Sequence, residues 1–167
     1  MLVPILDDNT FEYFSRSADQ TRRFGLRLGT MIKSNQLVCL SGELGSGKTT
    51  LVQGLAQGWG STEPVTSPTF VLINEYGRPD GEILFHLDAY RLNNATEGED
   101  LDIDEMLSRG SLVVEWPENI RSALPSNALF IAMRWMADEQ RGMLISSRGE
   151  EYRAMLAEVR QQVYGGY

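Results

Sequence analysis

A glycine-rich segment between two apolar runs most constrains the fold of this 167-residue chain. Residues 42–49 read Gly-Glu-Leu-Gly-Ser-Gly-Lys-Thr and fit the pattern G-x-x-x-x-G-K-[ST]. Glycines in such a segment let consecutive backbone N–H groups turn inward around an anion, and the following helix directs its N-terminus at the same anion. The pattern therefore predicts a strand, a phosphate-binding loop and a helix, in that order.

The sequence on both sides of this loop has the character that the pattern requires. Residues 36–41 form a short apolar run that predicts a strand buried on both faces, and residues 48–58 predict the helix. Lys48, one of only two lysines in the chain, is expected to reach the β- and γ-phosphates of a nucleotide. The Thr49 hydroxyl is expected to ligate Mg²⁺. The alternative is an ordinary strand–turn–helix without a ligand.

The remaining patterns place this unit in a larger α/β fold. Ser17 and Gln20 form a capping box that begins a helix over residues 18–33. We expect further strands over 11–16, 69–76, 82–88, 111–115, 128–135 and 141–147, and helices over 100–108 and 150–163. This mixture of crossovers and hairpins predicts a P-loop NTPase-like three-layer α/β fold with a mixed, mainly parallel sheet, in one domain over residues 1–167.

Two of the expected strands end in a carboxylate. Asp88 follows the apolar run 83–87, and Glu115 follows the run 111–114. An acid after an apolar strand is typical of the carboxylates that serve Mg²⁺ in nucleotide-binding proteins, and strand ends lie at the sheet edge where open α/β sheets bind ligands. Either residue alone can be a surface acid at a strand exit, and the sequence leaves open which is closer to the metal.

Four further features have both a functional and a structural interpretation. Ser67 and Thr69 lie in a hydroxyl-rich loop, where P-loop proteins carry γ-phosphate sensors, but a Ser-Pro turn has the same composition. His86 alternates into an apolar strand, which favours a packed, hydrogen-bonded histidine over a catalytic base. Trp116 is interpreted as a packing residue. Arg141 is either a surface residue or a phosphate contact.

Composition limits the partners and the compartment of the chain. With 42% hydrophobic and 23% charged residues it is neither disordered nor membrane-embedded, and it contains no apolar run of eighteen residues. The single cysteine, Cys39, and an N-terminus unlike a signal peptide predict a cytoplasmic protein. The net charge of −8 predicts no nucleic-acid binding by the chain alone. Six carboxylates between Glu97 and Glu105 form either a solvated face or a docking surface.

Four motifs in series resemble one family. They are Gly-Glu-Leu-Gly-Ser-Gly-Lys-Thr-Thr at 42–50, Val-Thr-Ser-Pro-Thr-Phe at 65–70, His-Leu-Asp-Ala-Tyr-Arg-Leu at 86–92 and Val-Glu-Trp-Pro-Glu at 114–118. In this order the motifs resemble the TsaE family, also called YjeE, of small P-loop ATPases. The resemblance implies a part in forming N6-threonylcarbamoyladenosine at position 37 of tRNAs that read codons beginning with A. It also implies that the protein acts on a TsaD–TsaB complex, in which TsaD carries the transfer chemistry.

The resemblance assigns roles to residues that match the motifs. It implies Lys48, Asp88 and Glu115 as catalytic residues, Thr49 and Glu115 as Mg²⁺ ligands, and Asp88 as an acid near the metal or the attacking water. The nucleotide-binding residues implied are Gly42, Gly45, Ser46, Gly47, Lys48, Thr49, Thr50, Ser67, Thr69, Trp116 and Arg141. An adenine contact is expected near residues 17–21. Glu43 and Ala89 depart from the commonest residues of the motifs, and neither change removes a ligand.

These features predict a Mg²⁺-dependent ATPase that turns over slowly without its partners, because no arginine finger is evident in the sequence. A kinase of a small molecule or nucleotide is an alternative, but only Arg109 and Arg121 follow the acidic stretch as candidates for its lid. A GTPase is disfavoured because Asn-Lys-x-Asp does not occur. A nucleotide-dependent interaction module with little hydrolysis is also compatible with the sequence.

Overall fold

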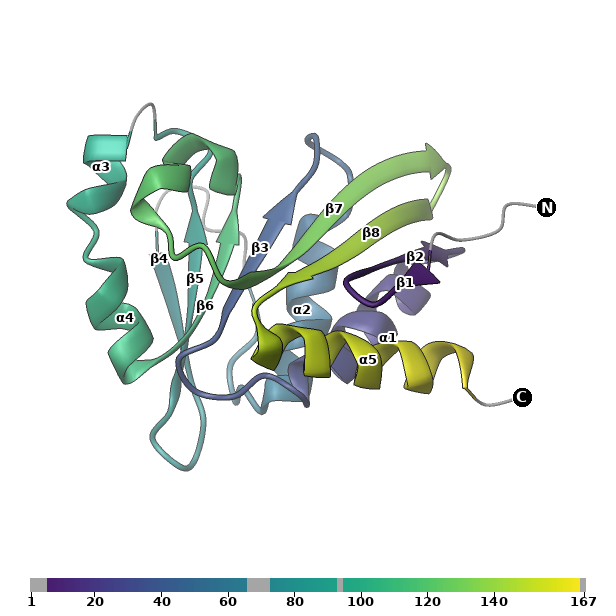
Figure 1. The fold of residues 1–167 in the computed structure, drawn as a ribbon, viewed down its shortest axis with the longest axis horizontal. Helices are drawn as coiled ribbons and strands as arrows, with labels where there is room; N and C mark the ends of the chain where they lie inside the picture. The colour runs from purple at the N-terminus through teal and green to yellow at the C-terminus, as the bar shows by residue number, and fades with distance from the viewer. Residues whose placement is uncertain (1–5, 66–72, 93–94, 166–167) are drawn as a thin grey trace.

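The computed structural model describes residues 6–65, 73–92 and 95–165, and within them the strands form one eight-stranded sheet (Figure 1). The strand order is β1-β2-β8-β7-β3-β6-β5-β4. The strands are β1 (Leu6–Asp7), β2 (Thr10–Ser15), β3 (Leu37–Ser41), β4 (Ile73–Gly77), β5 (Ile83–Asp88), β6 (Gly110–Glu115), β7 (Ala128–Ala137) and β8 (Gln140–Arg148). The helices are α1 (Ala18–Gly29), α2 (Lys48–Trp59), α3 (Ala95–Glu99), α4 (Ile103–Arg109), the 3₁₀-helix η1 (Pro117–Ala123) and α5 (Glu150–Tyr164).

The mixed α/β sheet expected from the sequence is confirmed, but its parallel part is confined to the centre. Strands β7, β3, β6 and β5 are parallel neighbours, whereas β1, β2, β8 and β4 join the sheet through antiparallel pairs. The expectation of a mainly parallel sheet was therefore too broad. The sheet contains these antiparallel pairs because short hairpin connections, such as β7–β8, can join only antiparallel strands.

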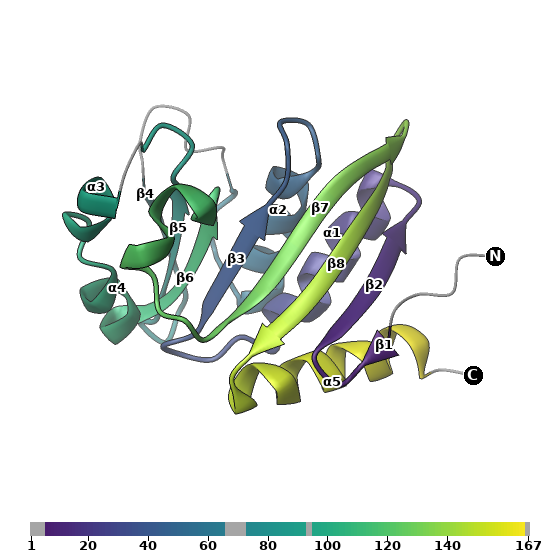
Figure 2. The same cartoon turned by 45° about the horizontal axis from the view of Figure 1, so that its top comes forward.

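Helices cover both faces of the sheet, so the expected three layers are present (Figure 2). On one face α1, α2 and α5 pack on a cluster that includes Val38, Leu40 and Val113. On the other face α4 and η1 pack on Cys39, Leu112 and neighbouring residues. The alternation along β3 explains the division, because successive side chains point to opposite faces. None of the helices in the described ranges is long and apolar enough to cross a bilayer.

Two helix boundaries differ from the expectation. The capping box of α1 is confirmed, since the Ser17 side chain accepts from the Gln20 amide, but the helix ends at Gly29 instead of residue 33. Tighter turns follow it, with the Met31 amide donating to the Leu28 carbonyl, and they keep the apolar side chains in the core. The helix expected over 100–108 is present as α4 but begins only at Ile103, because the left-handed backbone of Asp102 (φ 53°) separates it from α3.

Glycines bring the backbones of α1 and α2 into direct contact. A Cβ atom at Gly25 would lie 2.4 Å from the Leu51 carbonyl oxygen, and one at Gly54 would lie 1.9 Å from the Arg22 carbonyl oxygen. Since these obstacles are backbone atoms, no change of rotamer can relieve them. The glycines thus set the distance between α1 and α2, the helix that begins at the glycine-rich loop.

We expect Gly54→Ala to lower the free energy of unfolding by about 2 kcal/mol or more, because overpacking against backbone outweighs the gain in helix propensity. Gly77→Ala is the matched control, since a Cβ atom there meets nothing within 4 Å. Urea denaturation of both variants measures the difference. Equal stabilities would contradict the close approach of α1 and α2.

Candidate functional site

The loop between β3 and α2 requires glycine at its first position. Gly42 has φ 143°, and a Cβ atom there would lie 2.5 Å from the Met133 carbonyl oxygen and 2.7 Å from Ser46 Oγ. Gly47, with φ 100°, is the N-cap of α2 and offers no side chain to the first amides of that helix. The loop and the helix start therefore bring together backbone N–H groups of the kind that bind an anion at a helix N-terminus.

Lys48 turns back over this loop. Its Nζ donates to the carbonyl oxygens of Gly42 and Glu43, the latter at 3.0 Å, and lies 4.6 Å from the ring centroid of Trp116. Burial lowers the pKa of Lys48, while the charges of Glu115 and Asp88 act in the opposite direction. The ammonium group is thus held inside the loop and near both strand-end acids.

Asp88 and Glu115 meet at the carboxyl edge of the sheet. They are direct partners in the parallel register of β5 and β6. Glu115 is buried, whereas Asp88 is half-buried and accepts from the Tyr90 amide at 2.9 Å. Burial raises the pKa of Asp88, and the charge of Glu115 raises it further. The structure therefore places both expected acids on the same side of the sheet edge as Lys48.

A buried histidine holds Glu115. His86 Nε2 lies 2.7 Å from Glu115 Oε2, and His86 Nδ1 lies 3.3 Å from the Tyr76 hydroxyl. The interpretation of His86 as a packed, hydrogen-bonded residue is confirmed, since its side chain is 0% exposed. Its hydrogen bond to Glu115 was not predicted from the sequence. The signal was the spacing: His86 and Asp88 share a face of one strand, and Glu115 ends the neighbouring strand.

Trp116 closes the other side of the lysine. Its backbone is left-handed (φ 59°), a costly conformation for a large side chain, and its amide donates to the Leu40 carbonyl at 3.1 Å. Its ring packs against Tyr90 with the centroids 5.0 Å apart. The turn after β6 thus sets an aromatic ring beside Lys48.

Arg141 lies against the loop from the β7–β8 hairpin. Its Nη1 donates to the carbonyls of Asp138 and Gln140, and its Nε is buried without a hydrogen-bond partner among the described residues. The same Nε would be 3.4 Å from a Cβ atom at Gly47. An unsatisfied cationic N–H group beside a glycine of this loop fits an anion in that place.

The other expected residues are less informative. Thr49 and Thr50 lie in the first turn of α2 and are half-buried, and Ser46 is buried. Ser67 and Thr69 fall outside the described residues. In the segment expected to contact adenine, Ser17 caps α1, and the Thr21 hydroxyl is buried 2.6 Å from that of Ser15.

The donors at this edge suit a hard cation that also binds phosphate. They are the Thr49 hydroxyl and the carboxylates of Asp88 and Glu115, all oxygen ligands of the kind that Mg²⁺ takes. In the part of the chain that the structure describes, no group of three or more His, Cys, Asp or Glu residues could hold a metal unaided. A Mg²⁺ ion held by one or two protein oxygens and by substrate phosphates fits this donor set.

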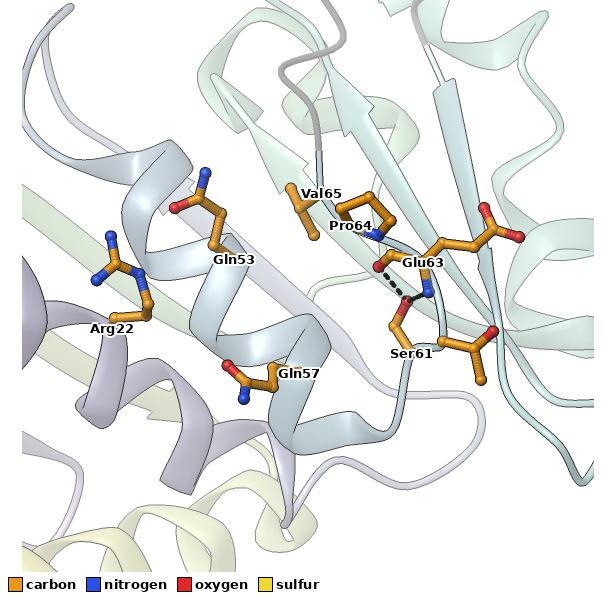
Figure 3. Close-up of a pocket in the computed structure, with 8 residues that line it drawn as sticks. Arg22, Gln53, Gln57, Ser61, Glu63, Pro64 and Val65 are labelled. Carbon is orange, nitrogen blue, oxygen red and sulfur yellow. Dashed lines mark hydrogen bonds between the residues drawn. The ribbon is translucent and has the colours of Figure 1, made fainter.

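A cavity of about 310 Å³ lies on the flank of α2, away from these residues (Figure 3). Arg22, Gln53 and Gln57 line it from α1 and α2, opposite residues 61–65. Ser61 Oγ holds the segment through its donor and acceptor bonds to Glu63. Among the residues that the structure describes, none of those expected to bind nucleotide or metal lines this cavity.

Comparison with known proteins identifies relatives over most of the chain. Residues 15–143 match the family model described as "Threonylcarbamoyl adenosine biosynthesis protein TsaE". A TsaE protein of Streptomyces coelicolor is 43% identical over 137 residues, which cover 78% of this chain and 93% of the relative. A TsaE protein of Bacillus subtilis is 35% identical, over 84% of this chain and 88% of the relative. The crystal structure of Bacillus subtilis YdiB superposes with a TM-score of 0.77 at 25% identity, covering 98% of this chain and 99% of that one.

Asp88→Asn is expected to stabilise the protein in the absence of nucleotide. The folded state raises the pKa of Asp88, so its ionisation opposes folding as the pH rises above the ordinary value near 3.8. The gain at pH 7 should be below about 1 kcal/mol, because the half-exposed group is screened by solvent. At pH 3, where aspartic acid is protonated in both states, the gain should vanish.

Urea denaturation at the two pH values checks this sign. Asp80→Asn serves as a control with the opposite direction, because its partner Arg78 lowers the pKa of Asp80. A loss of stability at pH 7 in Asp88→Asn would contradict the described environment of Asp88.

Proposed function

The chain belongs to the TsaE family of threonylcarbamoyladenosine biosynthesis proteins, and on this premise we propose that it is the Mg²⁺-dependent ATPase of that pathway. The observation that carries the proposal is the convergence of Lys48, Asp88 and Glu115 on the glycine loop. The role in forming the modified tRNA nucleoside belongs to the family. The reaction, its cofactor and its partners are our proposal for this chain.

The phosphates of ATP would lie in the cradle of residues 42–49. The backbone amides of the loop and the first turn of α2 supply donors, and Lys48 exchanges its bonds to the Gly42 and Glu43 carbonyls for phosphate oxygens. The orphan Nε of Arg141 supplies a further donor beside Gly47. The three sources of positive potential support binding of a polyphosphate.

Thr49 and Glu115 are the proposed Mg²⁺ ligands. When bound, the ion neutralises charge on the phosphate oxygens. His86 supports the role of Glu115, because a carboxylate that shares a short hydrogen bond with a buried ring keeps one orientation. Asp88 is free of this pairing and is the proposed acid that orients the attacking water.

Lys48 acts on the transferred phosphoryl group. Its ammonium offsets the charge that develops on the phosphoryl oxygens, and Trp116 limits the water that reaches it. We propose that turnover is slow in the isolated protein and that hydrolysis resets a TsaD–TsaB complex in the cytoplasm.

The arginines available for a kinase lid lie elsewhere. Arg109 ends α4 at the opposite edge of the sheet and pairs with Glu105 at 3.4 Å. Arg121 lines a cavity on the sheet face away from α2. These positions favour hydrolysis over transfer to a second substrate. An interaction module would support tRNA modification with little ATP hydrolysis. The experiment described next separates this alternative from an ATPase.

We expect Lys48→Ala to fold normally and to lose about 10²–10³-fold in the rate of ATP hydrolysis, because one preorganised donor to the phosphoryl group is removed. Lys33→Ala is the matched control, since Lys33 is the other lysine of the chain and is exposed. Single-turnover hydrolysis of both variants with TsaD and TsaB present measures the effect. A wild-type rate in Lys48→Ala would overturn the phosphate-loop assignment, and a wild-type tRNA modification rate in a variant that binds ATP without hydrolysing it would favour the interaction module.

The acidic surface around α3 and α4 suits a basic partner. Asp100 and Asp104 are exposed, and neither forms an ion pair with a described residue. Asp102 differs, because its side chain caps α4 by accepting from the Glu105 amide. The arginines of α1 form no comparable basic surface, and Arg22 pairs with Asp19. We therefore propose that the chain does not bind tRNA alone and that it competes with tRNA for the TsaD–TsaB complex.

Asp100→Lys together with Asp104→Lys should slow association with TsaD–TsaB, most strongly at low salt, because charge steering is screened within about 10 Å at 0.1 M salt. Asp19→Lys is the control, because Asp19 lies on α1, outside the acidic surface. Stopped-flow mixing measures the association rates. Association that is independent of salt and of the double change would refute the docking surface. A gel shift of tRNA by the isolated protein at physiological salt would refute the indirect role.

A further inference from the structure

A second cavity, of about 450 Å³, lies on the sheet face away from α2. Cys39 and Phe130 form part of its wall, and both belong to the core layer under η1 and α4. The opposite face of the sheet carries Val38 and is covered by α2, the helix that begins at Lys48. None of the described residues proposed to bind nucleotide or metal lines this cavity, although its lining includes Ser41 and Pro117, the chain neighbours of Gly42 and Trp116.

Two arginines at this cavity have no anionic partner. Arg121 lies on η1 and Arg148 ends β8, and neither guanidinium forms an ion pair or hydrogen bond with a described residue. Arg148 is stacked over the Phe130 ring, with its guanidinium carbon 5.0 Å from the centroid. Among the described residues that line the cavity, Glu118 is the single carboxylate. The chain has a net charge of −8, so two unpaired cations at one concave surface contrast with its overall negative electrostatic potential.

The rest of the wall is apolar with a few hydroxyl groups. Phe130, Leu124 and Cys39 give a hydrophobic part of the wall, and the exposed residues Ser122 and Ser126 also line the cavity. Burial raises the pKa of Cys39 to about 12, so its thiol is a neutral part of the wall. The volume falls within the range of about 300–1,000 Å³ that is usual for small-molecule sites, which also combine apolar walls with a few polar groups.

We propose that this cavity binds a small organic anion, with a flat apolar body against Phe130 and Leu124 and a carboxylate between Arg121 and Arg148. A guanidinium recognises a carboxylate by paired N–H donors, and stacking on Phe130 preorganises one of the two groups. The Glu118 carboxylate disfavours ligands with more than one negative charge. This inference does not depend on the reaction proposed above.

The test uses 1-naphthoate, a planar aromatic carboxylate, and its neutral analogue 1-naphthalenemethanol as probes of the full-length protein. We expect amide shifts in ¹H–¹⁵N spectra at residues 39–41, 121–124, 126 and 148, with weaker binding of the alcohol. Arg121→Gln and Arg148→Gln should each weaken naphthoate binding about tenfold, because a charged hydrogen bond is lost. Arg134→Gln is the matched control: Arg134 stacks over Phe14 on the same sheet and does not line the cavity.

Both target arginines are exposed, and the spectra themselves report whether each variant is folded. A bulky Ser126→Trp substitution at the margin provides a second route, since it fills the cavity without changing its charge. The proposal would be overturned if the two probes bound equally or if the three arginine variants lost equal affinity. It would also be overturned if the shifts were confined to other residues, or if millimolar naphthoate caused no shifts.

Discussion

The in-register parallel pairing of β3, β6 and β5 is the constraint on which the site depends. It aligns Leu40 with Glu115 and Glu115 with Asp88, so three strand ends meet at one edge of the sheet. The glycine loop leaves β3 at this edge and directs α2 back across one face. A shift of one residue in either pair would turn an acid to the other face of the sheet and away from Lys48.

Charge at this edge is concentrated and only partly balanced. Lys48 is surrounded by two loop carbonyls, an aromatic ring and two nearby acids, and its position depends on all of them. Glu115 is buried and held by His86, whereas Asp88 is half-buried and ionises at a cost. This division of environments gives the two carboxylates different roles, because a fixed group suits a metal and a freer one suits water.

Local signals in the sequence were sufficient for most elements. The capping box, the glycine loop and the strands expected over 128–135 and 141–147 each depend on neighbouring residues, and all are present. Features that depend on tertiary contacts were not predictable. The break at Asp102, the 3₁₀-helix after Trp116 and the end of α1 at Gly29 follow from packing, although the apolar spacing continues. The His86–Glu115 pair joins two strands whose adjacency no local pattern encodes.

The Mg²⁺ dependence of ATP binding tests the central claim most directly. Calorimetric titration of ATP at a series of Mg²⁺ concentrations compares wild type, Glu115→Gln and Asp88→Asn. Glutamine can still bond to His86 but supplies no charge to the ion. The account predicts that Mg²⁺ strengthens binding to wild type and Asp88→Asn and has little effect on Glu115→Gln. Equal Mg²⁺ dependence in all three proteins would contradict it.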